Sequence, residues 1–232
     1  VVAVDPSSLR TGGALLGDRA RISTDPEDRG VFIRSMAARD RLGGVSDQTV
    51  AAVALMRALF DRVLVETVGI GQSEADIAFV ADTVLLCIQP GSGDSLQFMK
   101  AGVMELPDIV VVTKADMGEV AKRARSEVEG ALTLFTREDD WVPPVVLVAA
   151  PTGEGLDALH AALAAHRAHL GHERLAARRA AQQATWIAES IRARFGSEGL
   201  KVARGMAIAA AGPFGREREI AGRLGAALDV LK

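Results

Sequence analysis

The chain has 232 residues, of which 49% are hydrophobic, 25% are charged and only 4% are aromatic. This composition is ordinary for a globular protein whose core rests on Ala, Val, Leu and Ile. The net charge of −3 gives no reason to expect nucleic acid or an anionic membrane as a partner. No apolar run approaches the roughly 20 residues of a membrane span, and the single cysteine, Cys87, excludes a disulfide framework. We therefore expect a soluble protein of the cytoplasm, with Cys87 as a buried thiol within a strand.

Short apolar runs alternate with segments of helical length along the first part of the chain. The strands expected from these runs are Val1–Val4, Arg62–Glu66, Thr83–Ile88, Ile109–Thr113 and Val145–Ala149. The helices expected between and after them are Asp47–Phe60, Asp94–Val103, Met117–Phe135 and Glu154–Ala165. Near-continuous apolar strands separated by helices predict an α/β fold with a mostly parallel sheet flanked by helices.

After about His169 the pattern changes to long helices rich in Arg, Ala and Gln. Apolar residues recur there at helical spacing and predict one apolar stripe: Trp186, Ile187, Ile191 and Phe195. A second helix is expected at Glu217–Leu231. We therefore expect residues 1–170 to form one domain and residues 171–232 to form a helical extension, with the stripe packed on the domain or on a second copy.

The sequence Thr113-Lys114-Ala115-Asp116 comes directly after the apolar run Ile109–Val112. In parallel sheets flanked by helices, ligands bind at the carboxyl ends of the strands. A carboxylate at such a loop can accept hydrogen bonds from the ring N–H and the exocyclic amine of guanine, a pair of donors that adenine lacks. Lys114 can lay its aliphatic stem against the base. These residues predict a guanine-nucleotide site; the alternative is a helix N-terminus capped by an acidic residue.

Other loops that follow predicted strands carry residues suited to metal or phosphate. Glu66 could hold a Mg²⁺ ion directly or through water, and Gly69 would let its backbone amide approach a terminal phosphate. The opening loop from Asp5 to Arg19 combines acids, glycines and small hydroxyls, which suits a loop that binds metal and phosphate. Ala150 lies in the last of these loops, where the edge of a base would be. The alternatives are an ordinary strand end with a turn, and a solvated Gly-rich loop.

With these residues in view, the chain resembles the MeaB/ArgK-like family of phosphate-loop GTPases, accessory proteins of cobalamin-dependent methylmalonyl-CoA mutase. The matching stretches are Val4–Ser8, Gly12–Arg19, Val65–Glu74, Pro90–Gly102 and Thr113–Asp116. The resemblance implies a G domain of the P-loop NTPase type at residues 1–170 and a helical dimerisation extension at residues 171–232. It also implies a homodimeric chaperone that binds and hydrolyses GTP and assists a cobalamin-dependent acyl-CoA mutase.

The same resemblance implies a role for each site residue. The residues expected around Mg²⁺ and the attacking water are Asp5, Asp18 and Glu66. Those expected to act in hydrolysis are Glu66, Gly69 of the second switch, and Asp94, Gln97 and Lys100 of a third switch that relays the nucleotide state to the mutase. The residues expected to read the guanine of GTP or GDP are Thr113, Lys114 and Asp116, with Ala150 near the carbonyl oxygen of the base.

Three departures from the family pattern affect these expectations. Thr113 stands where Asn is usual, and Ala149-Ala150 stands where Ser-Ala is common. The third departure is that the chain has no G-x-x-x-x-G-K-[ST] phosphate loop, which in the family precedes the strand that here begins at Val1. That unit would also supply a central strand, without which the neighbouring strands keep unpaired edges. We therefore expect a phosphate loop upstream of Val1.

Two alternative functions remain open at this stage. If Val1 is the true start, the chain would be a catalytically inactive module that binds the mutase. A second alternative is a nickel metallochaperone GTPase, which would use the clustered histidines His160, His166, His169 and His172. No Cys or carboxylate completes an evident metal site beside them.

Overall fold

The computed structural model describes residues 1–5, 22, 24–25, 27–37, 45–67, 74–91, 103–135 and 140–229. These residues form two compact units, Val1–Leu175 and Ala176–Lys232. Each unit has a hydrophobic core of its own. Among the described helices, none combines the length and the apolar character that a membrane span requires.

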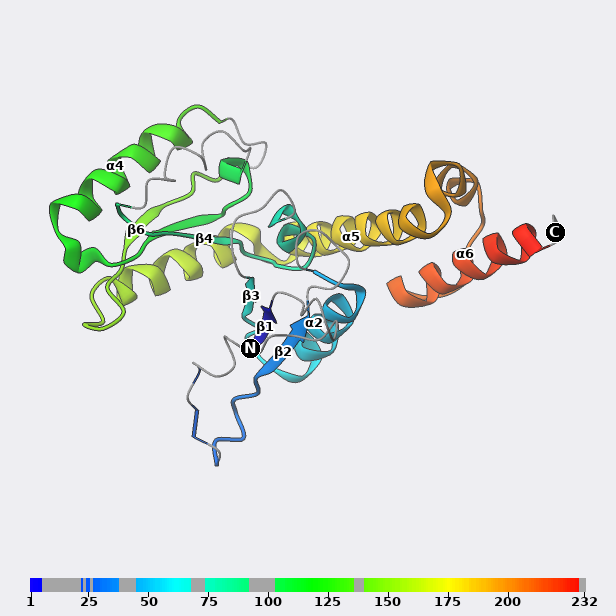
Figure 1. The fold of residues 1–232 in the computed structure, drawn as a ribbon, viewed down its shortest axis with the longest axis horizontal. Helices are drawn as coiled ribbons and strands as arrows, with labels where there is room; N and C mark the ends of the chain where they lie inside the picture. Colours follow the sequence, from blue (N-terminus) through cyan, green and yellow to red (C-terminus); the bar gives the residue numbers. More distant parts are fainter. Residues whose placement is uncertain are drawn as a thin grey trace, which may run out of the picture. The chain divides into compact units, whose positions relative to one another are not determined.

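The first unit contains two three-stranded parallel sheets (Figure 1). In the first sheet the central strand is β1 (Val2–Asp5), which pairs with β2 (Arg34–Ala37) and with β3 (Val65–Thr67). In the second sheet the central strand is β5 (Ile109–Val112), which pairs with β4 (Leu85–Ile88) and with β6 (Val145–Leu147). Parallel sheets with flanking helices confirm the predicted α/β class.

The helices have the following bounds. The α-helices are α2 (Asp47–Leu59), α4 (Glu119–Leu132), α5 (Leu156–Arg204) and α6 (Gly212–Asp229). The short 3₁₀ helices are η1 (Glu74–Phe79), η2 (Val103–Glu105) and η3 (Ala115–Met117). The start of α2 shows a local sequence signal, because the Ser46 hydroxyl accepts a hydrogen bond from the Thr49 amide at 3.3 Å.

Helices cover both faces of the second sheet. Val110 and Val112 of β5 pack with Ala121 and Val128 of α4 on one face. On the other face the core contains Ile109, Val111 and Ala162, with Leu159 and Leu163 of α5 packed against it. Figure 1 shows α4 and the first part of α5 on opposite sides of this sheet. Alternate side chains of a strand point to opposite faces of the sheet. Because helices cover both faces here, every residue of β5 is buried, and this explains the continuous apolar sequence of the strand.

The first sheet is covered on one face by α2 and η1. Val2 and Val4 of β1 share a core with Val53 of α2 and Val80, and Ile77 of η1 packs against it. Arg57 of α2 donates to the carbonyl oxygen of Val80 and forms an ion pair of 3.1 Å with Asp82. These contacts fix α2 on the residues that lead into β4.

Several predicted elements differ from the structure. β2 is not expected from the sequence, because Arg34–Ala37 has no apolar run and becomes a strand by pairing with β1. The predicted burial of Cys87 is wrong: the residue is exposed, because β4 pairs only with β5 among the described residues. The helix expected at Asp94–Val103 falls almost wholly outside the described residues.

The helix predicted to end at Ala165 instead continues as α5 to Arg204. The residues that follow Ala165 are mostly Ala, Leu, Glu, Gln and Arg, which favour helix, and none is proline. Gly171 and Gly196 have φ of +53° and +69°, so regular helical geometry is interrupted at these two positions.

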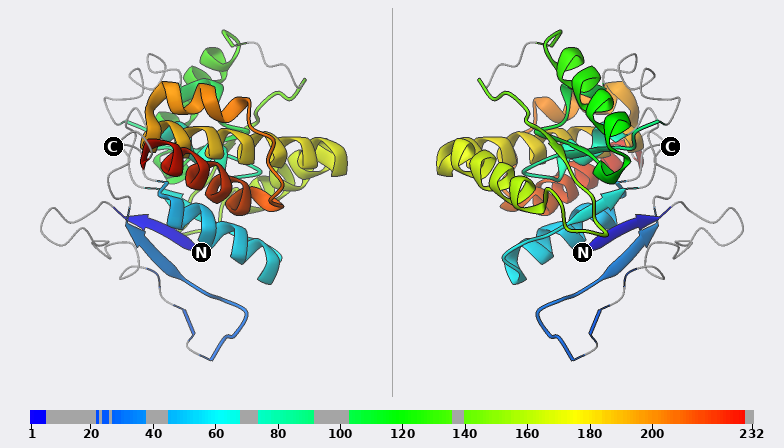
Figure 2. Two further views of the ribbon diagram at one scale, coloured as in Figure 1. Left: turned by 90° about the vertical axis from the view of Figure 1, so that its right-hand side faces the viewer. Right: turned by 90° about the vertical axis from the view of Figure 1, so that its left-hand side faces the viewer.

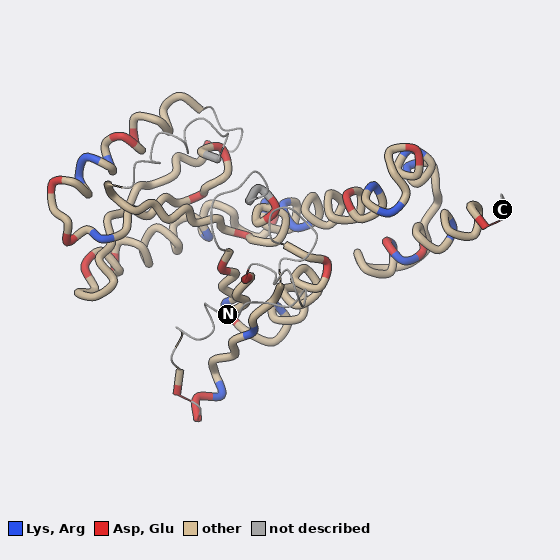
Figure 3. The backbone as a smooth tube through the Cα atoms, in the orientation of Figure 1, with Lys and Arg blue, Asp and Glu red and all other residues tan. Residues whose placement is uncertain are grey.

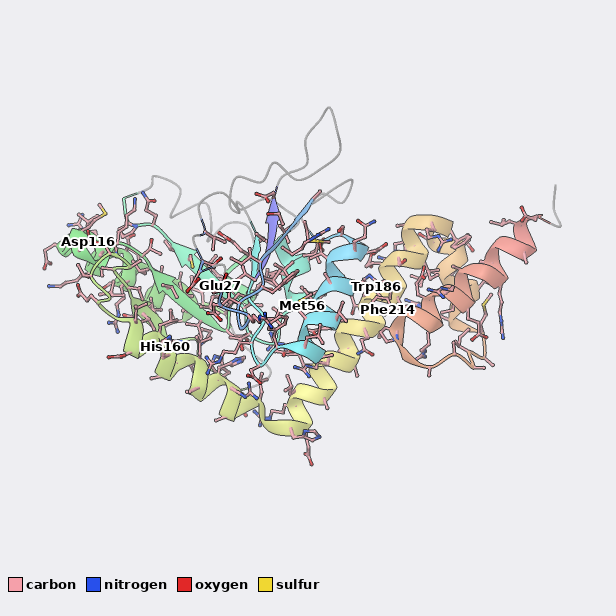
Figure 4. The ribbon with its side chains drawn as sticks, turned by 90° about the horizontal axis from the view of Figure 1, so that it is seen from below. Glu27, Met56, Asp116, His160, Trp186 and Phe214 are labelled. Carbon is pink, nitrogen blue, oxygen red and sulfur yellow. The ribbon has the colours of Figure 1, made fainter. Side chains whose placement is uncertain are left out.

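The second unit is a pair of helices, the last part of α5 and α6 (Figure 2). Its core includes Ile191, Leu200, Ile220 and Leu224. The rings of Trp186 and Phe214 lie edge to face, with centroids 5.1 Å apart (Figure 4). The apolar stripe expected on the long helix is therefore covered by α6.

Candidate functional site

The Thr113–Asp116 loop is fixed by the strands on both sides of β5. The backbone N–H and the hydroxyl of Thr113 both donate to the carbonyl oxygen of Ile88, at 2.8 and 3.1 Å. On the other side, the N–H of Ala115 donates to the carbonyl oxygen of Val148 at 3.1 Å. Ala115 is buried, with 8% of its surface exposed. The loop therefore begins at a position set by the ends of both β4 and β6.

Lys114 has a left-handed backbone conformation, with φ of 53° and ψ of 47°. For a residue with a Cβ atom this conformation costs on the order of 1 kcal/mol. The Lys114 carbonyl oxygen accepts a hydrogen bond of 2.9 Å from the N–H of Met117, which closes the turn. Strained residues of this kind persist where the surrounding structure holds them and where a function needs the conformation.

Asp116 lies at the margin of the first unit with its side chain exposed (Figure 4). Within the described part of the chain, no hydrogen bond or ion pair involves its carboxylate, and it does not cap α4. The N-cap of α4 is Gly118, which makes no side-chain capping bond. Asp116 is therefore not the acidic helix cap that the alternative interpretation of this loop predicted. The exposed carboxylate is available to accept hydrogen bonds from a ligand.

The loop from Ala149 to Gly155 lies beside the Thr113–Asp116 loop, because Val148 bonds to Ala115. The Ala149 carbonyl oxygen accepts from the N–H groups of Thr152 and Gly153, at 3.2 and 3.0 Å. Gly155 has φ of +77°, and a Cβ atom there would collide with the carbonyl oxygen of Leu147. These turn bonds do not use the N–H of Ala150, for which the described residues provide no acceptor. This amide and the Asp116 carboxylate are a donor and an acceptor on neighbouring loops.

Asp5 and Glu66 lie on neighbouring strands of the first sheet. Ala3 of β1 pairs with Glu66 of β3, so Asp5, two residues further, lies on the same face of the sheet as Glu66. This face is opposite to the one that Val2 and Val4 bury against α2. Asp5 is buried, with 1% exposed, and Glu66 is exposed. Their carboxylate oxygens are donors of the kind that Mg²⁺ prefers.

Glu66, on the first sheet, also interacts electrostatically with Cys87, on the second sheet. Partial burial raises the pKa of the Cys87 thiol, and the Glu66 carboxylate raises this pKa further. A carboxylate of β3 thus lies within electrostatic reach of a thiol of β4, although Cys87 is an exposed residue. Among the described residues, β3 and β4 each pair on one side only. The Glu66 carboxylate and the Cys87 thiol are thus close enough to interact electrostatically across the two sheets.

Several predicted site residues lie outside the described residues: Asp18, Gly69, Asp94, Gln97 and Lys100. Their roles stay predictions, as does the magnesium shell that includes Asp18. The described residues contain no group of three or more His, Cys, Asp or Glu that could hold a metal ion. The structure thus brings together the predicted base-reading residues, and separately Asp5 and Glu66.

Of the histidines considered for nickel, His166 and His169 lie near each other, with ring centroids 6.4 Å apart, but the described residues form no group of three or more metal-binding side chains. His166 is completely buried and faces Thr83 and Asp108, with ring nitrogens 2.9 Å and 3.4 Å from their side-chain oxygens. The ring of His169 lies against Trp141, with centroids 5.1 Å apart. Its nitrogens face the guanidinium of Arg174. The described part of the structure gives the nickel alternative no support.

Sequence reasoning missed the groups that hold the loops in place. Two of these groups are the backbone carbonyl oxygens of Ile88 and Val148. A third is the carbonyl oxygen of Leu147, with which a Cβ atom at position 155 would collide, so that only glycine fits there. Backbone carbonyls carry no side-chain signature. Only the Pro-Thr-Gly-Glu-Gly pattern of residues 151–155 signals the tight turn in advance.

The family model described as methylmalonyl Co-A mutase-associated GTPase MeaB matches residues 1–201. A probable GTPase of Mycobacterium tuberculosis is 44% identical over 198 residues, which are 83% of this chain and 59% of that protein. The mitochondrial methylmalonic aciduria type A homolog of Mus musculus is 38% identical over 192 residues (81% and 46%). GTPase ArgK of Escherichia coli is 36% identical over 192 residues (81% and 58%). The chain spans less than two thirds of the length of each of these relatives.

Proposed function

Since the chain belongs to the MeaB family of methylmalonyl Co-A mutase-associated GTPases, we propose that it binds and hydrolyses GTP as a chaperone of a cobalamin-dependent acyl-CoA mutase. The observation that carries the nucleotide proposal is the loop after β5. Its exposed Asp116 carboxylate lies on the loop next to that of Ala150, on a backbone held by Ile88 and Val148. One acceptor and one donor in this arrangement match the N–H groups and the carbonyl oxygen on one edge of guanine.

Each residue of the loop has a distinct part in binding. The Asp116 carboxylate accepts from the ring N–H and the exocyclic amine of guanine, and the Ala150 N–H donates to its carbonyl oxygen. The exposed Lys114 lays its aliphatic stem on the face of the base. Adenine presents neither the paired donors nor the carbonyl oxygen, so the same groups select against ATP.

Asp5 and Glu66 are the described residues that would hold Mg²⁺ near the phosphates. Their carboxylates share one face of the first sheet at neighbouring strands, and oxygen ligands suit this ion. When bound, Mg²⁺ would neutralise charge on the phosphate oxygens. Asp5 is held inside the sheet, whereas Glu66 is exposed and can orient the attacking water in line with the leaving group.

Hydrolysis also requires a phosphate loop, which residues 1–232 do not contain. We propose that a further parallel strand carrying this loop lies between β3 and β4 in the complete protein. Among the described residues β3 and β4 pair on one side only, and Glu66 of β3 acts electrostatically on Cys87 of β4. Leu64, just before β3, and Leu85 of β4 are 66% and 37% exposed, which is unusual for apolar residues beside a central strand.

The client and the dimer are further parts of the proposal. The family description and the mouse relative's name support a methylmalonyl-CoA mutase as the client. The second unit is proposed as the dimerisation element, and it exposes Val202 and Leu228 by 55% and 51%. The single cysteine is a free thiol, which fits a reducing compartment such as the cytoplasm.

Calorimetric titration of the complete protein with GDP and ADP tests the nucleotide proposal. We expect a preference for GDP of about 100-fold, because two charge-assisted hydrogen bonds to Asp116 are lost with adenine. Asp116→Ala should abolish this preference. Glu127→Ala, which changes an exposed carboxylate of α4, should leave it unchanged. Equal affinity of the parent protein for GDP and ADP would overturn the proposal.

Steady-state GTP turnover and co-sedimentation with the mutase separate the proposed GTPase from the inactive module. The GTPase predicts turnover and a complex whose affinity differs between GTP and GDP. The inactive module predicts a complex without turnover. Sedimentation of the protein alone tests the homodimer, and a monomer at all concentrations would contradict that part.

A further inference from the structure

The hydroxyl oxygen of Ser35, on β2, is buried and has no hydrogen-bond partner among the described residues. Folded proteins satisfy nearly all of their buried polar groups, because an acceptor or donor left unpaired in the interior destabilises the fold. A buried hydroxyl without a protein partner therefore indicates a partner that is not a protein atom, such as a water molecule or a group bound with an ion.

Strand pairing and packing place Ser35 on the face of the first sheet that carries the proposed Mg²⁺ ligands. Ser35 of β2 and Glu66 of β3 both pair with Ala3 of β1. β1 is the strand between the other two (Figure 1). The next residue along β2, Met36, packs against the core on the α2 face. Since alternate side chains point to opposite faces, Ser35 lies on the same face as Asp5 and Glu66.

The hydroxyl lies within reach of a ligand shared with both carboxylates. Ser35 pairs with Ala3, and Asp5 is two residues further along β1. A strand spacing of about 4.8 Å and a rise of about 3.3 Å per residue separate the Cα atoms of Ser35 and Asp5 by about 8 Å. This separation suits one small molecule between a hydroxyl and a carboxylate. At the level of Ala3, only its methyl group stands between Ser35 and Glu66.

We propose that Ser35 is a positioning residue for the Mg²⁺ ion: its hydroxyl oxygen accepts a hydrogen bond from a water molecule that the ion keeps. The inference rests on the proposed function, in which Asp5 and Glu66 hold this ion. Mg²⁺ loses its hydration water reluctantly and usually keeps several water molecules in a protein site. These waters need acceptors for their hydrogens, and Ser35 supplies one without touching the ion.

The experiment uses Mn²⁺ as the probe, because it also prefers carboxylate and water oxygens. Mn²⁺ is titrated into the complete protein saturated with GDP, and free Mn²⁺ is measured by electron paramagnetic resonance. GDP affinity is measured separately in EDTA, where no ion is bound. This second measurement separates an effect on the ion from a general effect on the fold.

The variants test the hydroxyl apart from the shape of the side chain. Ser35→Ala removes the hydroxyl without adding bulk. Ser35→Val and Ser35→Thr have the same shape, and only Ser35→Thr keeps the hydroxyl. Ser46→Ala is the control for lost stability, because the Ser46 hydroxyl caps α2, which covers the other face of the sheet. Thermal unfolding shows which variants are folded at the temperature of the titration.

We expect Ser35→Ala and Ser35→Val to weaken Mn²⁺ binding by about tenfold, the usual effect of removing a group that bonds to a ligand of a metal. Ser35→Thr and Ser46→Ala should keep the parent Mn²⁺ affinity. GDP affinity in EDTA should be the same in every folded variant, because the hydroxyl acts on the ion and not on the nucleotide.

Unchanged Mn²⁺ affinity in folded Ser35→Ala would overturn the inference, as would an equal loss in Ser35→Thr. A fall in GDP affinity in EDTA as large as the fall in Mn²⁺ affinity would also overturn it, since it would show a general structural role. A parent protein that binds GDP but no Mn²⁺ would overturn the metal part of the proposed function together with this inference. A parent protein that does not bind GDP would contradict the nucleotide proposal itself.

Discussion

The imidazole of His166 and the carboxylate of Asp108 face each other in the interior of the first unit, both with no exposed surface. The Nε2 atom of His166 lies 3.4 Å from Oδ1 of Asp108. The other carboxylate oxygen accepts a hydrogen bond of 2.8 Å from the N–H of Val84. The indole N–H of Trp141 donates to the backbone oxygen of Asp108 at 2.7 Å. This polar cluster attaches α5 to the amino ends of β4 and β5, away from the Thr113–Asp116 loop at the carboxyl end of β5.

Asp108→Ala should lower the free energy of unfolding by about 3 kcal/mol, because it leaves the buried Val84 amide without its acceptor and removes the carboxylate that faces the buried imidazole of His166. Asp108→Asn keeps an oxygen for the Val84 amide and should cost about half as much. Urea unfolding followed by circular dichroism measures both changes. Equal losses in the two variants would show that the Val84 hydrogen bond contributes little. GDP affinity should stay at the parent value in each folded variant.

Gly155→Ala should disrupt the loop after β6 in both stability and binding. Its φ of +77° disfavours any Cβ atom, and the added atom would collide with the Leu147 carbonyl oxygen. We expect a loss of about 2 kcal/mol or more in unfolding free energy and weaker GDP binding through displacement of Ala150.

The matched control for this change is Gly130→Ala. Gly130 lies in α4, and a Cβ atom there meets nothing within 4 Å. This substitution should stabilise the protein by about 0.5 to 1 kcal/mol through helix propensity. Denaturant midpoints of the two variants should therefore move in opposite directions. A Gly155→Ala variant as stable as the parent would contradict the role assigned to the left-handed backbone of Gly155.

Much of the second sheet could be predicted from the sequence, because its central strand β5 is buried throughout and its neighbours are also apolar runs. β5 and β6 lie within the predicted apolar runs, and Asp116 follows β5 as expected. The position of Asp116 could be predicted because the tetrad follows an apolar strand directly, and its part in base recognition stays a prediction. The parallel pairing follows from the helices between the strands.

Other features depend on contacts between residues far apart in sequence. β2 is a strand because its backbone pairs with β1, and Arg34–Ala37 alone has no strand pattern. His166 is buried because it meets Thr83 and Asp108, which an isolated histidine on a helix does not reveal. The hydrogen bond of Thr113 to Ile88 involves a backbone oxygen, which has no sequence signature. The acidic and basic residues along α4 (Figure 3) are easily recognised, but they form surface pairs of small effect.

Lys114→Gly should change the GDP affinity of the Thr113–Asp116 loop without lowering the free energy of unfolding. Glycine adopts a φ of 53° without strain, so we expect the free energy of unfolding to stay constant or to rise by up to about 1 kcal/mol. GDP affinity should fall, because the aliphatic stem that we propose to cover the base is removed. Thermal unfolding and GDP titration of the same sample measure the two effects.

Arg123→Gly is the control for Lys114→Gly, since Arg123 is an exposed cation in the regular helix α4. It should lower the free energy of unfolding by about 0.5 to 1 kcal/mol and leave GDP affinity unchanged. If Lys114→Gly destabilises the protein as much as Arg123→Gly does, the left-handed conformation is not a source of strain.

The thiol of Cys87 should react slowly with iodoacetamide at neutral pH. Burial raises its pKa, and the negative charge of Glu66 raises the pKa further, so a smaller fraction is the reactive thiolate. The rate should increase with pH, with its midpoint above the ordinary thiol pKa. Because the folded state holds this proton more tightly than the unfolded chain, the associated stability is present below the ordinary pKa. It is lost as the pH rises through the folded value.

Glu66→Gln isolates the electrostatic part of this effect. Removing the negative charge should move the midpoint of the alkylation profile to lower pH while burial keeps it above the ordinary value, since burial is the larger cause. Glu127→Gln, on the exposed face of α4, should leave the profile unchanged. A midpoint that does not move in Glu66→Gln would mean that the Glu66 carboxylate of β3 does not act on the Cys87 thiol of β4. The support for a further strand between them would then be lost.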